Sequence, residues 1–346
     1  MLTLDQGGAV IGSRRLLLPP HDLLPFVELI SIDRRTQPPR PAESAWRVVP
    51  DASGHLLYHA LDPALDAALD AALDHALGSA LGPAVERTLL HAADRSGEPR
   101  SSRRLLAVGA RSRPVDLDVR HRWLTAAVRV RPGALPRLVG AGGAELVDRG
   151  IELDTLQGRW IGPLADRLHA AADLAAAEPG LSGTAERALY DALVDLTRAL
   201  LGRRRTRSAI HGNPLSAATA AIAGGRAASV ADLAHALGTS PRGLHQRVRR
   251  ELGFGPKRWL TIHRLHRAFD LALYGRHRGW ADVAAAAGFA DQSHLIRSSR
   301  ELLGETPGAY LTRGQASAAR WPKRPIEIAG PESPATDRAP AQRTSR

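Results

Sequence analysis

Two stretches near the C-terminal end of the chain repeat one pattern: LAHALGTSPRGLHQRVRRELGFGPKRWL starts at Leu233, and VAAAAGFADQSHLIRSSRELLGETPGAYL starts at Val283. Equivalent positions are 50 residues apart at Gly238 and Gly288 and 51 residues apart from the following helix onward. The second copy therefore has one more residue in the short segment after the glycine. A pattern that occurs twice in this way predicts one structural unit used twice.

Each copy has the features of a helix-turn-helix unit. Gly238 and Gly288 follow an apolar helical segment, and glycine readily adopts the left-handed backbone that a tight turn needs. Ser240, which precedes Pro241, and Asp291 are residue types that cap the start of a helix. We therefore expect two helices joined by a short turn in each copy.

The second helix of each unit, which we call the recognition helix, is predicted to be amphipathic. One face repeats every fourth residue and comprises Leu244, Val248 and Leu252 in the first unit, and Leu295, Ser299 and Leu303 in the second. The opposite face carries Arg, His and Gln side chains. Such a face suits a DNA groove; the alternative is that it is only solvated.

The polar faces supply candidate DNA contacts of two kinds, base-reading and phosphate-binding. The predicted base-reading residues are Arg242, His245 and Gln246 in the first unit, and Gln292, Ser293, His294 and Arg297 in the second. The predicted phosphate-binding residues are Arg249, Arg250, Lys257, Arg258 and Arg300. Arginine can donate two hydrogen bonds to guanine and glutamine can pair with adenine, so these residue types can distinguish bases.

The helix expected between the units would span residues 257–274, which is 18 residues. At ~1.5 Å per residue its length is about 27 Å, comparable to one DNA turn of ~34 Å. One chain could therefore place its two recognition helices in successive major grooves without a dimer.

The paired units and the helix between them resemble the DNA-binding domain of AraC/XylS-type transcription regulators, over about residues 215–313. The most specific motifs are G-F-x-D-Q-S-H-L from Gly288 and G-x-T-P-x-x-Y from Gly304. The resemblance implies base contacts at Arg242, His245, Gln246 and Arg297, with double-stranded DNA and RNA polymerase as partners. One position departs from the family. Relatives usually have an aromatic residue at the position of Ser299, so we expect a less well packed second unit, which Ser299→Phe would stabilise.

The positive charge of the chain is concentrated on the repeated stretch. The formal net charge is +12 for the whole chain. Residues 203–313 contain 18 Lys and Arg against 7 Asp and Glu, which is a net +11. A basic region next to a nearly neutral remainder is the pattern expected for phosphate binding.

Several classes of protein are excluded or disfavoured by absent residues and motifs. The chain has no cysteine, which excludes disulfides, thiolate zinc sites, cysteine nucleophiles and the methyl-accepting repair proteins with a similar DNA-binding domain. We find no G-x-S-x-G, H-E-x-x-H or P-loop motif, so we expect no enzyme activity and no cofactor. No apolar run approaches the ~18 residues that would span a bilayer, and a soluble bacterial protein of the cytoplasm is expected.

A metal site at His55 and His59 is not expected. In a β-strand their spacing places them on one face but ~13 Å apart at ~3.3 Å per residue, which is too far for one metal ion.

The fold class expected is α+β: a mixed β and helical sensor-like region, followed by an all-α region with two helix-turn-helix units joined by a long helix. RVVPDASGHLLY from Arg47 and LVDRGIELDTLQGRW from Leu146 resemble the sensor-like region of one group of these regulators. The expected divisions are a flexible leader at 1–20, the sensor-like and oligomerisation domain at 21–202, a basic linker at 203–214, the DNA-binding domain at 215–313 and a disordered tail at 314–346.

Within the sensor-like domain we expect a short helix entering a strand at 21–32, and two strands around a turn at 51–54. Further strands are expected at 105–110, 115–119 and 123–135, and two helices between 153 and 201. Leucines at every fourth position from Leu61 to Leu81 predict a helical insert within about 61–102. This insert packs on its own domain, mediates dimerisation or is loosely ordered.

Three functions remain open at this point. The preferred one is a sequence-specific transcription regulator modulated through its N-terminal domain by an unknown small molecule or protein, with a homodimer through that domain as a further expectation. The alternatives are a non-specific architectural DNA-binding protein and an enzyme with a DNA-binding appendage. Activation or repression depends on where the bound site lies relative to a promoter, which no residue encodes.

Overall fold

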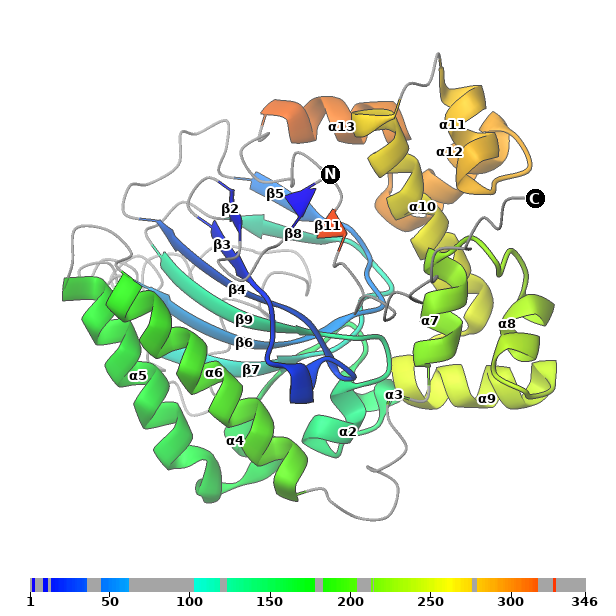
Figure 1. The fold of residues 1–346 in the computed structure, drawn as a ribbon. Coiled ribbons are helices and arrows are strands. Elements are labelled where there is room, and N and C mark those ends of the chain that lie inside the picture. The colour runs from blue at the N-terminus through cyan, green and yellow to red at the C-terminus, as the bar shows by residue number, and fades with distance from the viewer. Residues whose placement is uncertain are drawn as a thin grey trace, which may run out of the picture.

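The structure is a computed structural model with two parts, a β-sheet flanked by helices and a region made only of helices (Figure 1). It describes residues 2–3, 9–11, 14–35, 45–61, 103–118, 123–177, 183–203, 213, 215–275, 279–316 and 326–327. We call residues 9–203 the sheet region and residues 215–316 the helical region. The α+β fold class predicted from the sequence is confirmed.

The main sheet has seven antiparallel strands in the order β10-β7-β6-β9-β4-β3-β2. Their bounds are β2 Ala9–Ile11, β3 Arg14–Leu17, β4 Val27–Arg35, β6 Gly54–Leu61, β7 Arg103–Val108, β9 Trp123–Val130 and β10 Gly150–Glu152. The short 3-10 helix η1, His21–Leu23, leads into β4 as the sequence predicted.

One face of this sheet is apolar because successive side chains of a strand point to opposite faces, and apolar residues occupy every second position. In β6 the side chains of Leu56, Tyr58 and Ala60 all point into the same buried cluster. Helices α5, Gly162–Ala177, and α6, Gly183–Arg203, run side by side across this face (Figure 1). The two helices predicted between 153 and 201 are therefore confirmed. Shorter helices complete the region: α2 Leu135–Val139, α3 Gly143–Leu146, α4 Leu153–Gln157 and the 3-10 helix η4 Arg159–Ile161.

Two smaller strand pairs accompany the main sheet. Strand β5, Ala45–Val48, pairs with β8, Val115–Asp118, and β1, Leu2–Thr3, pairs in parallel with β11, Ile326–Glu327. The strands predicted on either side of the 51–54 turn are present as β5 and β6, but they belong to different sheets.

The leader predicted at residues 1–20 is wrong for its described part, because β2 and β3 form an edge of the main sheet. Arg15 also forms a 3.0 Å ion pair with Glu186 of α6. Arg14 and Arg15 interrupt the apolar pattern that would have marked a strand. The predicted disordered tail is likewise wrong at its first residues, because α13 continues to Ala316.

Three other sequence predictions fall wholly or partly outside the described residues. They are the leucine-rich insert, apart from its flanking strands, residues 204–212 of the basic linker, and the tail at 317–325 and 328–346.

The helical region contains seven helices among the described residues. They are α7 Ser216–Ala223, α8 Val230–Ala236, α9 Pro241–Leu252, α10 Pro256–Tyr274, α11 Trp280–Ala287, α12 Gln292–Leu303 and α13 Pro307–Ala316. They share one buried apolar cluster, and Val49, Ala52 and Ala110 of the sheet region belong to the same cluster. The two regions are thus packed against each other through an apolar interface.

Candidate DNA-binding face

The first helix-turn-helix unit consists of α8 and α9. Gly238 has φ +58° in the turn, and Ser240 accepts a 3.1 Å hydrogen bond from the backbone N–H of Gly243. Ser229 and Asp232 form a reciprocal capping box at the start of α8, as predicted. These caps fix where each helix begins, and so they fix which side chains lie in the first turn of α9.

Helix α9 has the predicted division into a buried and an exposed face. Leu244, Val248 and Leu252 are buried in the core of the helical region. The side chains on the other face are exposed: Arg242, His245, Gln246, Arg249 and Arg250. The structure thus brings the five candidate contacts of this helix onto one accessible surface.

The second unit consists of α11 and α12 and has the same construction. Gly288 ends α11 with φ +87°, and Asp291 accepts a 2.6 Å hydrogen bond from the N–H of His294. Phe289 and Ala290 separate Gly288 from the cap Asp291, whereas one residue separates Gly238 from Ser240. The predicted extra residue therefore lies in the turn.

Helix α12 exposes four of its five candidate contacts, which are Gln292, Ser293, Arg297 and Arg300. The fifth, His294, is half-buried. Its ring lies edge-on to Phe289 with centroids 5.3 Å apart, and its Nδ1 accepts a 3.3 Å hydrogen bond from the N–H of Ala290. Neutral His294 therefore has its proton on Nε2, which is the nitrogen left to donate to a ligand.

Ser299, on which the expectation of a less well packed second unit rests, is buried and hydrogen-bonded. Ser299 is 0% exposed, and its hydroxyl donates a 2.8 Å hydrogen bond to the carbonyl of Glu305. The side chain of Ser299 is thus enclosed, and its hydrogen bond links α12 to the segment that follows the helix.

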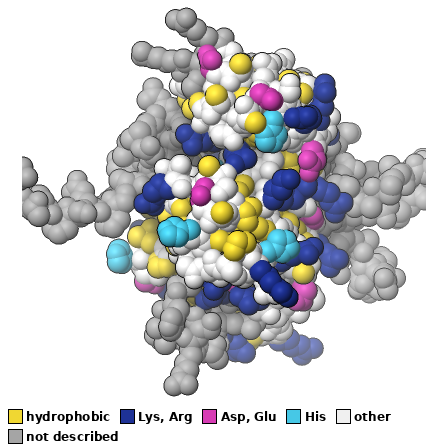
Figure 2. All heavy atoms as spheres, turned by 90° about the vertical axis from the view of Figure 1, so that its right-hand side faces the viewer, with side chains coloured by type: hydrophobic (Ala, Val, Ile, Leu, Met, Phe, Trp, Pro, Cys, Tyr) yellow, Lys and Arg dark blue, Asp and Glu magenta, His cyan; other side chains and the backbone are white. Residues whose placement is uncertain are grey.

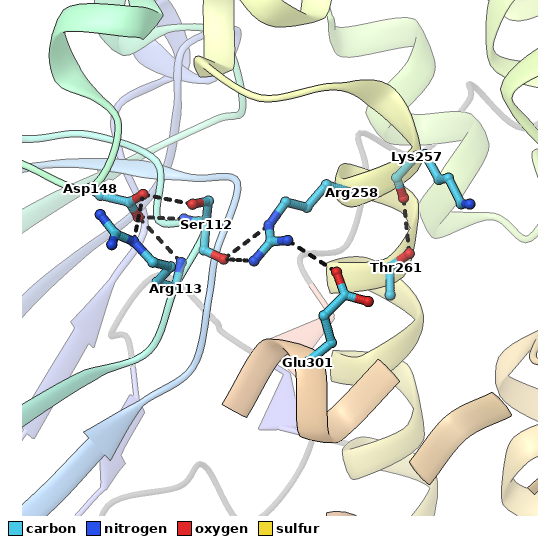
Figure 3. A network of polar contacts seen from close by, with 7 residues as sticks. All are labelled: Ser112, Arg113, Asp148, Lys257, Arg258, Thr261 and Glu301. Carbon is cyan, nitrogen blue, oxygen red and sulfur yellow. Dashed lines mark hydrogen bonds and ion pairs between the residues drawn. The ribbon is translucent and has the colours of Figure 1, made fainter. Parts of the chain in front are cut away.

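Arg258 of α10 lies against the sheet region (Figure 3). Its Nε and Nη2 donate to the carbonyl of Ser112 at 3.0 and 2.5 Å, and its Nη1 lies 3.3 Å from a carboxylate oxygen of Glu301 in α12. All three guanidinium nitrogens are thus engaged within the chain. In this arrangement Arg258 is not a candidate phosphate contact, unlike Lys257, which is exposed beside it.

Basic side chains are spread over the outer surface of the helical region. Figure 2 shows Lys and Arg side chains on this face together with histidines and apolar patches. This distribution agrees with the net charge of +11 over residues 203–313. A duplex placed here would meet a surface of favourable charge.

The histidines of β6, His55 and His59, are half-buried. Burial is the main cause that lowers the pKa of His55 to about 3 and that of His59 to about 4. His59 Nδ1 lies 3.1 Å from the hydroxyl of Thr125. Within the described ranges, no group of three or more His, Cys, Asp or Glu side chains is arranged to hold a metal ion. No described helix is long and apolar enough to cross a membrane.

Sequence reasoning did not identify Arg47 as a contact of the second unit. Arg47, in β5, donates a 2.8 Å hydrogen bond to the carbonyl of Leu303 at the end of α12. A single arginine in a strand carries no local signal of a partner 256 residues away.

Comparisons with known proteins bear on the helical region. Residues 233–313 match the family described as helix-turn-helix domain. No curated protein matches the chain in sequence. Among solved structures, ToxT from Vibrio cholerae matches with 10% identity and a TM-score of 0.35, covering 82% of this chain and 97% of ToxT. So low a TM-score carries no argument. The family match and the two repeated units show that residues 233–313 form a helix-turn-helix domain, which is similar to that of AraC/XylS-type transcription regulators.

Proposed function

We propose that the chain is a sequence-specific transcription regulator that reads two successive major grooves of double-stranded DNA, one with α9 and one with α12. The main support is that two equivalent, capped recognition helices both expose polar side chains from their first turn. Helix α10 between the units has 19 residues. It is therefore about 28 Å long, comparable to one DNA turn of ~34 Å.

The roles proposed for individual residues follow from their position on the two helices. Side chains in the first turns read base edges, and these are Arg242, His245, Gln246, Gln292, Ser293, His294 and Arg297. Basic side chains later in the two recognition helices, and one at the start of α10, contact phosphates. These are Arg249, Arg250, Arg300 and Lys257. Base contacts specify the sequence, whereas phosphate contacts supply affinity that falls with salt.

Selection of bound fragments from random DNA tests this proposal, because a sequence-specific protein should enrich one common sequence. The selected DNA then serves as the ligand in binding measurements. With the selected DNA, Arg242→Ala should weaken binding about 10- to 100-fold and relax the preference at one base pair. Arg250→Ala, on the same helix, should weaken matched and mismatched DNA equally and reduce the slope of log affinity against log salt by about 1. Equal losses on both DNAs for Arg242→Ala would contradict its base-reading role.

The remaining parts of the proposal concern partners. The sheet region would receive a small-molecule or protein signal, since it is a separate folded part with its own buried core. RNA polymerase is the proposed transcription partner, and a homodimer through the sheet region is a second proposed assembly. Action on bacterial DNA means a cytoplasmic protein.

A non-specific architectural DNA-binding protein is the main competing function. It would use the same charge but would return no common sequence from the selection experiment. The specific observation that favours a sequence reader is that both recognition helices expose residue types able to distinguish bases, not only cations.

A further inference from the structure

The two recognition helices end against the same neighbour, the sheet region. In α9 the last residue is followed by Gly253, and in α12 by the equivalent Gly304. Both glycines have left-handed backbone, with φ +82° and +79°. Beyond each of them lies a different part of the sheet region.

At the end of α9 the contact is made by backbone. A Cβ atom added to Gly253 would lie 2.5 Å from the carbonyl oxygen of Gly143 and 2.5 Å from the Cβ of Val147. A Cβ added to Gly143 would in turn lie 2.6 Å from the carbonyl carbon of Glu251. Helix α3 and the end of α9 thus touch through two glycines, with Val147 packed against the shared core.

At the end of α12 the contact is made by a charged side chain. The guanidinium of Arg47 donates to the carbonyl of Leu303, which is one of the carbonyls that a helix leaves without an internal partner. Arg47 Nη1 also lies 3.6 Å from a carboxylate oxygen of Glu305. A cation at this end is favoured by the helix dipole as well.

Arg258 of α10 makes a third contact with the sheet region (Figure 3). The Ser112 carbonyl that Arg258 binds belongs to a loop held by Asp148, whose carboxylate accepts from the N–H and the hydroxyl of Ser112 at 2.6 Å each. Asp148 itself has φ +58°, a conformation uncommon for residues other than glycine. Through Glu301, Arg258 joins this loop to α12.

From these three contacts we propose that the sheet region sets the distance and angle between the two recognition helices, with Arg47 and Arg258 as positioning residues. The relative placement of the helices determines which spacing of half-sites both can read at once. The sheet region would then contribute to sequence specificity without touching a base. This rests on the proposed two-groove function, but the geometry itself can be tested without DNA.

A distance measurement in the free protein tests the positioning directly. The chain has no cysteine, so Gln246→Cys in α9 and Ser293→Cys in α12 would be the only attachment points for nitroxide spin labels. Pulsed electron paramagnetic resonance of the full chain should give one narrow distance distribution. Adding Arg47→Ala and Arg258→Ala together should broaden or shift it. Arg187→Ala, which removes one positive charge from α6, should leave it unchanged. An unchanged distribution in the Arg47 and Arg258 variant would overturn the proposal.

Conservative variants separate positioning from misfolding. Arg47→Lys keeps a cation that can donate to Leu303, so it should restore most of the narrow distribution. If Arg47→Lys and Arg47→Ala broadened it equally while circular dichroism stayed at the wild-type level, the proposed contact of Arg47 would be wrong.

DNA carrying altered spacing gives the second readout. Inserting one base pair between selected half-sites turns them by about 34–36° relative to each other. Wild-type affinity should therefore fall at each insertion, whereas Arg258→Ala should bind the original spacing about tenfold more weakly and show a flatter dependence on spacing. If Arg258→Ala instead lowered the salt slope on non-specific DNA by about 1, Arg258 would be a phosphate contact. A wild-type chain that selects no sequence would contradict the proposed function, while the spin-label result would still decide the positioning.

Discussion

At the level of single residues, Ser299 is a small side chain that is both buried and hydrogen-bonded. Its hydroxyl donates to the carbonyl of Glu305, and the side chain is 0% exposed. We predict that Ser299→Ala lowers the free energy of unfolding by about 1 kcal/mol, because the carbonyl loses its partner. Ser299→Phe should cost more, about 1–3 kcal/mol from overpacking in addition.

Urea unfolding of both variants tests this, with Ser293→Ala on the exposed face of α12 as the control. A gain in stability for Ser299→Phe would restore the expectation drawn from the family, in which an aromatic residue fills this position.

His263 in α10 gives the helical region a dependence on pH. Burial, with a smaller contribution from the charges of His266 and Arg267, lowers the pKa of His263 to about 4. The unfolded chain takes up this proton below pH ~6.5, and the folded chain does so only near pH 4. Stability from this group is therefore complete above pH ~6.5 and is lost as the pH falls from there to about 4.

At pH 5 the loss from His263 should be about 2 kcal/mol relative to pH 7. His263→Gln should remove that part of the loss, whereas His245→Gln, on the exposed face of α9, should keep it. Urea unfolding at both pH values measures the difference. Equal losses in the two variants would show that His263 is not the group responsible.

At the level of helices and strands, the two glycines that end the recognition helices form a matched pair. Both have positive φ, so alanine is strained at either position. Among the described residues, the one atom that a Cβ at Gly304 would meet is Arg47 Nη1 at 3.7 Å, an ordinary contact, whereas at Gly253 it would collide with the backbone of Gly143.

Gly304→Ala should therefore cost about 1 kcal/mol, as for other such positions. Gly253→Ala should cost several times more, because helix α3 must also move. Thermal unfolding of the two variants side by side measures the difference, and equal losses would mean that α3 and α9 are not in contact in solution.

Helix positions were predictable from the sequence because their signals are local. The caps Ser240 and Asp291, the turn glycines and the four-residue spacing of leucines lie within a few residues of the helices that they define. Strand pairing was not predictable to the same degree. β5 pairs with β8, about 70 residues away, and the residues of β3 have no alternating apolar pattern. The contact of Arg258 with Ser112 has the same character, since it depends on two regions meeting.

At the level of the whole molecule, the shared apolar cluster predicts that both regions unfold together. Val49, Ala52 and Ala110 of the sheet region are each less than 10% exposed within the core of the helical region. We expect a single transition in scanning calorimetry of the wild-type chain. Ala110→Asp would bury a charge in the interface and should separate the transition into two.

Ala170→Asp, on the exposed face of α5, is the matched control and should leave the single transition intact. Two resolved transitions in the wild-type chain would show that the interface contributes little to stability. The spacing of the recognition helices would then have to be maintained within the helical region alone.

The contact between Gly143 and Gly253 also limits which parts of this chain could be joined to another protein. Consider a hybrid in which the helical region, residues 215–316, is joined to the N-terminal domain of another protein. It would lose helix α3, the loop that contains Ser112 and strand β5, together with their contacts to the helical region. The transplanted helices would keep their side chains and their charge. They would lack the contacts with the sheet region that set the distance between α9 and α12. A hybrid that keeps the original DNA spacing must therefore include those three segments of the sheet region as well.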